Sequence, residues 1–227
     1  MRILFLSFIV AMFMQDDVSK RQKMVKEQLM NRGIRNEDVL NAMKTVPRDA
    51  FVSKEYQHLA YDDMPLSIGY NQTISQPYIV AYMTEKLNLK KTQKILEVGT
   101  GSGYQAAILS LLADSVYTIE IVKPLGESAR TRLKELGYNN IKVKIGDGYQ
   151  GWKQYAPFDA IMVTAAPKVI PPPLVEQLKD NGLLIAPVGP ENGMQYLKLY
   201  QKKQGKLIKT KLLPVKFVPF TREKNIK

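Results

Sequence analysis

The sequence predicts an α/β fold with a doubly wound, mostly parallel sheet, and two observations carry that prediction. Between residues 94 and 186, short β-branched and apolar segments alternate with segments of helical period. A glycine-rich turn, Gly99-Thr100-Gly101-Ser102-Gly103, joins the first of these strands to the helix that follows. The chain has 227 residues, of which 45% are hydrophobic and 24% charged, as in an ordinary globular domain. We therefore expect one domain over residues 18–227.

The first 17 residues are set apart as an apolar leader. Arg2 precedes an apolar run over residues 3–14, which is too short to span a bilayer as a helix. The run suits a signal peptide, but the leader has a single basic side chain and no clean small-x-small cleavage site. A third alternative is an upstream start codon, with the folded protein beginning near Met14 or Met24.

The region before the alternating part is expected to be mainly helical. An amphipathic helix is predicted over 19–30, ended by Gly33, and a second over 36–43 with Asn36 as its N-cap. Residues 61–77 are rich in Asp, Pro, Gly, Asn and Ser, which favours a loop. A third helix is predicted over 78–89, with Pro77 in its first turn.

The alternating region is expected to form the central sheet. Strands are predicted over 94–98, 116–121, 141–145, 158–163 and 183–186, with helices over 104–113, 127–136 and 171–178. The tail, residues 196–218, predicts an antiparallel strand pair joined by a turn at Gln204-Gly205.

The counts of reactive residues exclude several chemistries. The chain has no cysteine and one histidine, His58, so disulfides, Cys-based zinc sites, a thiol nucleophile and a Ser-His-Asp triad are not expected. We expect no metal site and a structural role for His58. The net charge of +12 suits acidic partners, but a solvated lysine-rich surface is the more ordinary explanation.

The glycine loop predicts a ligand site at the carboxyl ends of the strands. Its glycines allow a sharp turn and a close approach to a ligand. The third position of the dinucleotide fingerprint falls on Tyr104, where that motif needs Gly or Ala. Glu97, just before the loop, would repel a pyrophosphate and attract a sulfonium and an amino group. These departures favour S-adenosylmethionine as the cofactor.

Two more acidic residues end neighbouring strands. Glu120 can accept hydrogen bonds from both ribose hydroxyls, and Asp147, between two glycines, can accept from an adenine amino group. Each has an ordinary alternative: Glu120 could be a surface residue and Asp147 part of a simple turn. Acidic residues at three strand ends together are nevertheless a more specific sign of a cofactor site than any one of them. The predicted cofactor-binding residues are Glu97, Gly99, Thr100, Gly101, Ser102, Glu120, Asp147 and Gly148.

Five segments carry a resemblance to a known family: 71–77 (Asn-Gln-Thr-Ile-Ser-Gln-Pro), 96–104, 146–148 (Gly-Asp-Gly), 158–161 (Phe-Asp-Ala-Ile) and 187–190 (Pro-Val-Gly-Pro). Together they resemble the protein-L-isoaspartate O-methyltransferases, which have a Rossmann-like methyltransferase fold. The resemblance covers about Lys20 to Thr221. The loop at 73–77 and the Val-Pro-containing tail are specific to that family, whereas the glycine loop is common to methyltransferases.

The resemblance implies an activity. A methyl group would pass from S-adenosylmethionine to the free α-carboxyl of an L-isoaspartyl residue in a damaged protein or peptide. The ester then closes to a succinimide unaided, and hydrolysis returns some aspartate. A carboxylate has a pKa near 4, so it is already an anion at pH 7 and needs no general base. What remains is positioning for in-line attack and desolvation of the nucleophile.

The resemblance also implies the substrate side of the site. Ser75 matches the family's active-site serine, and Thr73 and Ile74 would shape the same loop. Val215, Phe217 and Val218 lie in the segment that pairs with the substrate main chain in the family. The alternatives are an N-cap role for Ser75 and a buried edge strand for the tail.

Departures and rival functions complete the prediction. Lys179-Asp180-Asn181-Gly182 replaces the family's commoner Lys-Pro-Gly-Gly turn, and the apolar leader is unusual for a family that is generally cytoplasmic. We expect a cytoplasmic monomer without stable membrane association, with export to the periplasm through residues 3–14 as the alternative. We expect no nucleic-acid partner, because Val163-Thr164-Ala165-Ala166-Pro167 lacks the Asn/Asp-Pro-Pro-aromatic motif of enzymes that methylate amino groups of bases. The rivals are a methyltransferase acting on RNA, DNA or a small molecule, and a catalytically dead binding module.

Overall fold

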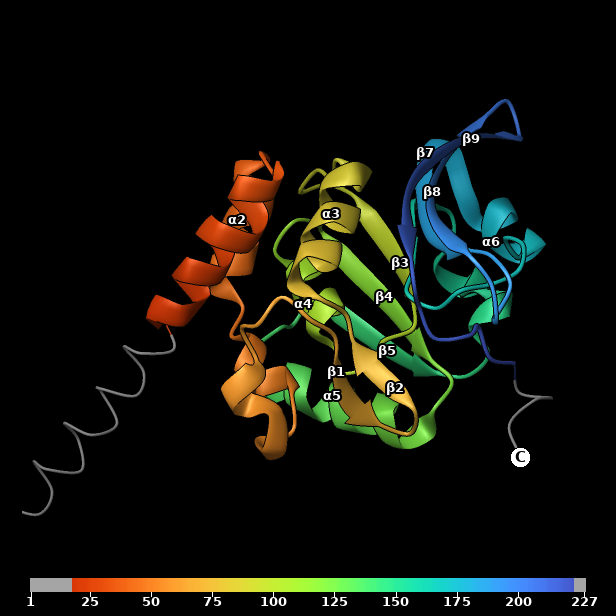
Figure 1. Cartoon of the computed structure of the whole chain (residues 1–227). Coiled ribbons are helices and arrows are strands. Elements are labelled where there is room, and N and C mark those ends of the chain that lie inside the picture. Colours follow the sequence, from red (N-terminus) through yellow and green to blue (C-terminus); the bar gives the residue numbers. More distant parts are fainter. Residues whose placement is uncertain (1–17, 223–227) are drawn as a thin grey trace, which may run out of the picture.

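A seven-stranded sheet forms the centre of the computed structural model, which describes residues 18–222 (Figure 1). The strand order is β5-β4-β3-β6-β7-β8-β9. The parallel strands are β3 (Lys94–Val98), β4 (Ser115–Glu120), β5 (Ile141–Ile145), β6 (Phe158–Val163) and β7 (Leu178–Val188). The chain winds outward from β3 through β4 to β5 and then returns to the other side of β3 with β6. This reversal is the doubly wound topology that the sequence predicts.

The sheet has an apolar cluster on each face, because both faces are covered. Along β3, Ile95 belongs to one cluster and Leu96 to the other. The first cluster packs under α2 (Glu37–Thr45), α3 (Pro77–Leu87) and α4 (Tyr104–Ser110). The second includes Leu174 of the short helix α6 (Pro172–Gln177). Helix α5 (Lys123–Glu135) packs against β4 and β5.

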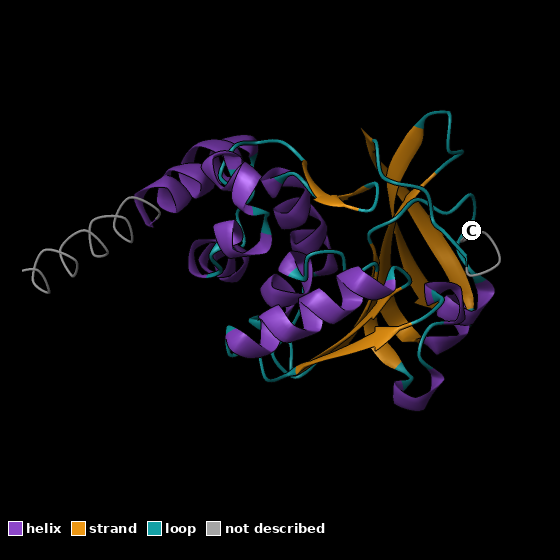
Figure 2. Ribbon diagram, turned by 90° about the horizontal axis from the view of Figure 1, so that it is seen from below, coloured by secondary structure: helices purple, strands orange, loops and turns teal. Residues whose placement is uncertain are grey.

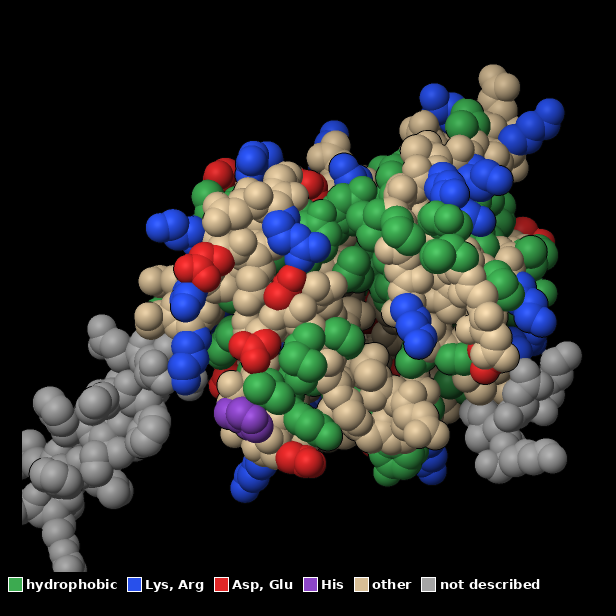
Figure 3. Space-filling view, viewed as in Figure 1, with side chains coloured by type: hydrophobic (Ala, Val, Ile, Leu, Met, Phe, Trp, Pro, Cys, Tyr) green, Lys and Arg blue, Asp and Glu red, His purple; other side chains and the backbone are tan. Residues whose placement is uncertain are grey.

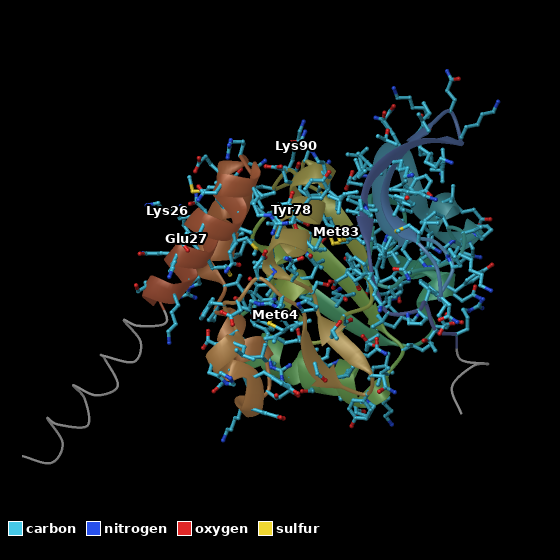
Figure 4. The ribbon with its side chains drawn as sticks, in the orientation of Figure 1. Lys26, Glu27, Met64, Tyr78, Met83 and Lys90 are labelled. Carbon is cyan, nitrogen blue, oxygen red and sulfur yellow. The ribbon has the colours of Figure 1, made fainter. Side chains whose placement is uncertain are left out.

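The N-terminal region is helical, as expected. Residues 18–24 are α-helical, η1 (Val25–Leu29) is a π-helical turn and η2 (Met30–Arg32) a 3₁₀ turn, and Gly33 ends the segment with φ of 93°. The Asn36 side chain accepts a hydrogen bond from the Val39 amide at 3.1 Å, which confirms the predicted N-cap. Figure 4 shows the helical segment that carries Lys26 and Glu27 at one side of the molecule. α3, which carries Tyr78, lies between that segment and the C-terminal strands.

The prediction of a loop over 61–77 is wrong, because this segment contains a hairpin of β1 (Leu66–Gly69) and β2 (Gln72–Ile74). Tyr70 and Asn71 both have positive φ, 54° and 56°, as a tight turn between twisted strands requires. Figure 2 shows the hairpin apart from the main sheet. The short 3₁₀ helices η3 (Arg48–Phe51), η4 (Lys54–Leu59), η5 (Gly148–Gln150) and η6 (Lys153–Tyr155) were also not predicted.

The C-terminal strands match the prediction. β8 (Gln195–Lys203) pairs antiparallel with β7 and with β9 (Lys206–Val215), and the turn lies at Gln204 and Gly205, which have φ of 50° and 76°. β7 begins at Leu178, five residues earlier than predicted. Within the described range, no helix is long and apolar enough to cross a membrane. The expectations for residues 1–17 lie outside the described residues.

Candidate active site

A cavity lies at the carboxyl ends of β3, β4 and β6, where the winding of the sheet reverses. We call it the loop cavity, because the glycine loop forms one wall. Figure 3 shows a hollow near the centre of this face of the molecule. The residues lining the loop cavity are Gln72–Ser75, Val80, Val98–Ser102, Tyr104, Gln105, Ile119–Ile121, Gly148, Thr164, Ala165 and Val218–Thr221.

A second cavity, which we call the tail groove, adjoins the first. Its walls come from the segment around the β1–β2 hairpin and from residues 214–218 of the tail. Four residues line both cavities: Thr73, Ser75, Thr164 and Val218. A ligand in the loop cavity and a second molecule in the tail groove would therefore meet beside these residues.

The glycine loop is held in place by a residue that the sequence alone did not assign to the site. The Thr164 hydroxyl, at the end of β6, lies 2.7 Å from the carbonyl oxygen of Gly99 and 3.0 Å from that of Val98. Gly99 has φ of 104°, and a Cβ on it would lie 2.2 Å from the Thr164 Oγ1 atom. Glycine at this position therefore satisfies both the backbone conformation and the close contact.

Glu120 is placed at the cavity wall with both carboxylate oxygens facing backbone amides. Gly101 N donates to Oε2 at 2.7 Å, and Val122 N donates to Oε1 at 2.9 Å. Burial raises the pKa of Glu120, and these amide donors oppose the rise. Two carboxylate oxygens offer about four lone pairs, so the side chain can still accept a bond from a ligand's hydroxyl beside these amides.

Glu97 lies behind the loop rather than in the cavity wall. It is fully buried, and its Oε2 atom accepts a 2.5 Å hydrogen bond from Thr118, whose hydroxyl oxygen is 2.6 Å from that of Thr100. Oε1 has no partner among the described residues. Burial raises the pKa of Glu97 to about 8, with the nearby Glu120 adding to the rise. This burial favours the neutral form of the carboxyl in the ligand-free protein.

Asp147 also lies outside the lining of the loop cavity, although its neighbour Gly148 is part of it. Its Oδ1 atom accepts from the Tyr149 amide at 2.9 Å, and Oδ2 pairs with Arg222 Nε at 2.6 Å. The Arg222 guanidinium also stacks 3.6 Å from the centre of the Tyr149 ring. The segment around Arg222, beyond the tail, is therefore attached to the loop after β5. No sequence motif identified Arg222 as this partner.

Ser75 is half-buried between the two cavities. The N-cap position of α3 belongs to Gln76, without a side-chain capping bond, so Ser75 does not cap this helix. Its hydroxyl makes no hydrogen bond with any described residue, which leaves it available to a ligand. Thr73 is exposed at the shared wall, and Ile74 is buried against the loop cavity.

The tail segment is fixed by a buried glutamine. Gln195 accepts from the Phe217 amide at 2.7 Å and donates to the Phe217 carbonyl oxygen at 3.2 Å. Further on, Ala166 N donates to Val218 O at 2.8 Å, and Phe220 N donates to Ala166 O at 3.1 Å. Val215 and Phe217 line only the tail groove, whereas residues 219–221, which were not predicted to belong to the site, line the loop cavity.

Comparison with known proteins identifies the family. A family model described as protein-L-isoaspartate(D-aspartate) O-methyltransferase matches residues 19–225. The chain is 56% identical to the protein-L-isoaspartate O-methyltransferase of Opitutus terrae, over 91% of this chain and 88% of that protein. It is 54% identical to that of Gloeobacter violaceus, over 88% of this chain and 98% of the relative. The chain belongs to the protein-L-isoaspartate O-methyltransferase family.

A solved structure supports the same assignment. A Plasmodium falciparum protein described as a putative protein-L-isoaspartate O-methyltransferase in complex with S-adenosyl-L-homocysteine superimposes with a TM-score of 0.78. It is 30% identical to this chain, and the match covers 89% of this chain and 99% of that protein. The sequence-based resemblance and fold class are thereby confirmed.

The structure brings most of the predicted site residues of this family member together. Gly99, Thr100, Gly101, Ser102, Glu120 and Gly148 line the loop cavity with Thr73, Ile74, Ser75 and Val218. Val215 and Phe217 line the adjoining groove, and Glu97 and Asp147 lie behind the walls. His58 is exposed on η4 and lies outside both cavities, so it contributes no buried packing.

Proposed function

We propose that this chain transfers a methyl group from S-adenosylmethionine to the free carboxyl of L-isoaspartyl residues in damaged proteins and peptides. Family membership supports the reaction. The arrangement of the two cavities supports the division of roles: the donor is held in the loop cavity and the acceptor in the tail groove. The observation that carries this assignment is the shared wall, where Ser75 lines both cavities and its hydroxyl has no partner among the described residues.

The residues of the loop cavity fit S-adenosylmethionine. Glu120 retains lone pairs for ribose hydroxyls. Glu97, buried behind the glycine loop with its Oε1 atom unpartnered, can favour a cationic amino group in the cavity by releasing its proton when the cation binds. Gly101, with φ of 53°, presents bare backbone to the cavity. Asp147 keeps lone pairs beyond those used by Tyr149 and Arg222, but it lies outside the lining of the loop cavity, so its role toward the adenine amino group stays a prediction. When bound, this cofactor supplies an electrophilic methyl group on a sulfonium.

The chain's own residues have little proton chemistry to perform. The acceptor carboxylate forms the new O–CH₃ bond as the S–CH₃ bond breaks, the electron pair stays on sulfur, and no proton moves. Ser75 can donate a hydrogen bond to the carboxylate without adding a positive charge that would lower its nucleophilicity. Val215, Phe217 and Val218 hold the acceptor's main chain, and residues 219–221 line the donor side of the site.

The decisive experiment measures transfer of labelled methyl to an isoaspartyl peptide and to its aspartyl twin. Base-labile label on the isoaspartyl peptide alone is expected. Ser75→Ala should lower kcat by about 10- to 100-fold, as expected for one lost hydrogen bond to a charged group, while cofactor affinity is retained. Ser53→Ala, at an exposed serine without a capping bond, is the control and should behave as wild type. Label on RNA instead of the peptide, or loss of cofactor binding in Ser75→Ala, would contradict the assignment.

We further infer a cytoplasmic monomer of one domain, residues 18–227, that acts on protein and not on nucleic acid. Both cavities are complete within one chain, so the proposed reaction needs no residue from a second copy. β6 leads into Thr164-Ala165-Ala166-Pro167, without the motif of enzymes that methylate amino groups of bases, which supports a protein acceptor. Light scattering of the purified protein and N-terminal sequencing of the mature chain test these inferences.

A further inference from the structure

The tail groove contains one cation, Lys216, and no anion among its lining residues. Those residues are Pro65, Thr73, Ser75, Gln76, Ile79, Thr164 and Pro214–Val218. The Lys216 side chain is exposed, and it takes part in none of the ion pairs found between residues 18 and 222. A lysine without an acidic partner, set in a groove that would receive a polypeptide, has its charge available to that polypeptide.

Further lysines continue from the groove along the edge of the sheet. Lys209 and Lys211 are exposed on β9, which pairs with β8 alone among the described strands. Lys198 lies directly opposite Lys211, and Lys203 opposite Lys206. Like charges placed opposite each other destabilise a strand pair. Figure 3 shows several basic side chains over the part of the molecule where Figure 1 places β8 and β9.

Lysines on an edge strand have an ordinary role, because they prevent the edge from pairing with other chains. That role accounts for Lys206, Lys209 and Lys211, but it does not account for Lys216. Lys216 follows the end of β9 and lies in the groove itself, next to Val215 and Phe217. The inference therefore rests on Lys216, and the β9 lysines only extend the positive field around it.

We propose that Lys216 is a specificity-determining residue that favours isoaspartyl sites flanked by acidic side chains. This inference rests on the proposed function, since it assumes that the tail groove holds the acceptor polypeptide. A flanking Glu or Asp placed along residues 215–218 would lie within reach of the Lys216 ammonium group. The reacting carboxylate itself is met by Ser75, a neutral donor, so the cation assists binding and does not lower the nucleophile's reactivity.

The test compares three isoaspartyl peptides in the whole enzyme: one with neutral flanks, one with Glu before the isoaspartyl site and one with Glu after it. At least one Glu peptide should have a kcat/KM about two- to fivefold above that of the neutral peptide, as expected for one exposed ion pair. The gain should lie in KM, and it should shrink in about 0.5 M salt. Equal kcat/KM for the three peptides in the wild type would overturn the proposal.

Variants of Lys216 locate the effect. Lys216→Gln should remove the preference, Lys216→Arg should keep it, and Lys216→Glu should reverse it toward a Lys-flanked peptide. Lys26→Gln makes the same change in net charge on the N-terminal helix, which Figure 4 shows on the far side of α3 from the tail, and it should keep the preference. If Lys216→Gln keeps the preference for acidic flanks, that preference arises from another residue and the proposal is refuted. Failure to methylate even the neutral peptide in the wild type would instead refute the proposed function.

Discussion

At the scale of single residues, Glu97 shows how position alters chemistry. Its place just before the glycine loop suggests an anion that attracts a cationic ligand. In the fold, β3 carries it into the interior, where it hydrogen-bonds to Thr118 and where burial raises its pKa to about 8. A neutral carboxyl can still favour a cationic ligand, because binding of the cation lowers the pKa and releases the proton.

The raised pKa of Glu97 predicts a pH dependence of stability in the ligand-free protein. The pKa of this group in an unfolded chain is 4.5, so the folded state binds the proton more tightly. The stability that the bound proton contributes is complete below pH 4.5 and is lost as the pH rises through about 8. A tenfold difference in proton affinity between the two states corresponds to about 1.4 kcal/mol, so the loss should reach about 1 kcal/mol or more. Thermal unfolding measured between about pH 5 and pH 9 should show a falling Tm.

The control for this dependence is a pair of substitutions. Glu97→Gln, which cannot ionise, should flatten the fall of Tm with pH, whereas Glu55→Gln, at an exposed site, should leave it unchanged. Parallel curves for wild type and Glu97→Gln would mean that Glu97 is already ionised in the folded protein.

How much of the site can be predicted at this scale depends on distance along the chain. Glu120 and the loop glycines are predictable, because their spacing from one strand end reflects local geometry. Thr164 and Arg222 are not, since each acts on a partner far away in the sequence: Thr164 on Gly99 and Arg222 on Asp147. No local pattern distinguishes them from any other threonine or arginine.

At the scale of elements, one part of the tail can be predicted from the local sequence and another part cannot. Its strand pair and the turn at Gln204-Gly205 follow from alternation and turn chemistry, and the structure confirms them. What holds the segment after β9 against the site is Gln195, whose side chain replaces a strand partner for Phe217. The β1–β2 hairpin escaped prediction because its strands are too short to show a period and its turn includes a tyrosine with positive φ.

The Gln195 contact predicts a selective loss of acceptor binding. In Gln195→Leu, the amide and carbonyl of Phe217 lose their partners, at a cost of about 1–3 kcal/mol for each group that stays buried. The wall of the tail groove should loosen and KM for the isoaspartyl peptide should rise about tenfold or more. Cofactor affinity should change less, since Val218 and Phe220 are held separately by Ala166. Kinetics and equilibrium titration of the same preparation measure both.

A matched control lies on the same strand. Gln201, half-buried on β8, makes no side-chain hydrogen bond with any residue from 18 to 222, and Gln201→Leu should leave KM near the wild-type value. Equal losses of cofactor and acceptor binding in Gln195→Leu would indicate that the tail moves as one unit, against this prediction.

At the scale of the whole molecule, the alternation of strands and helices predicts a mostly parallel sheet with crossovers of one hand, whereas the strand order itself comes from the structure. The ligand site then lies where the winding reverses. The identity of the acceptor does not follow from topology, since this fold carries many functions. It depends on the loop at 73–77 and the tail, two segments that the sheet brings to one edge.

The same topology predicts how ligand binding affects stability. The two apolar clusters share one sheet, so we expect a single unfolding transition, and the loop cavity lies at the end of the central strands β3 and β6. S-adenosylhomocysteine at about 100 times its Kd should add about 2.7 kcal/mol, or roughly 5–10 °C in Tm for a domain of this size. NADH, a dinucleotide, should give no shift. Gly101→Val should remove the shift, because a branched side chain at φ of 53° is strained and would press on Ile68 at the edge of the loop cavity. If the Tm shift persists in this variant, the cofactor binds outside the loop cavity. If only part of the unfolding signal shifts, the two apolar clusters unfold separately.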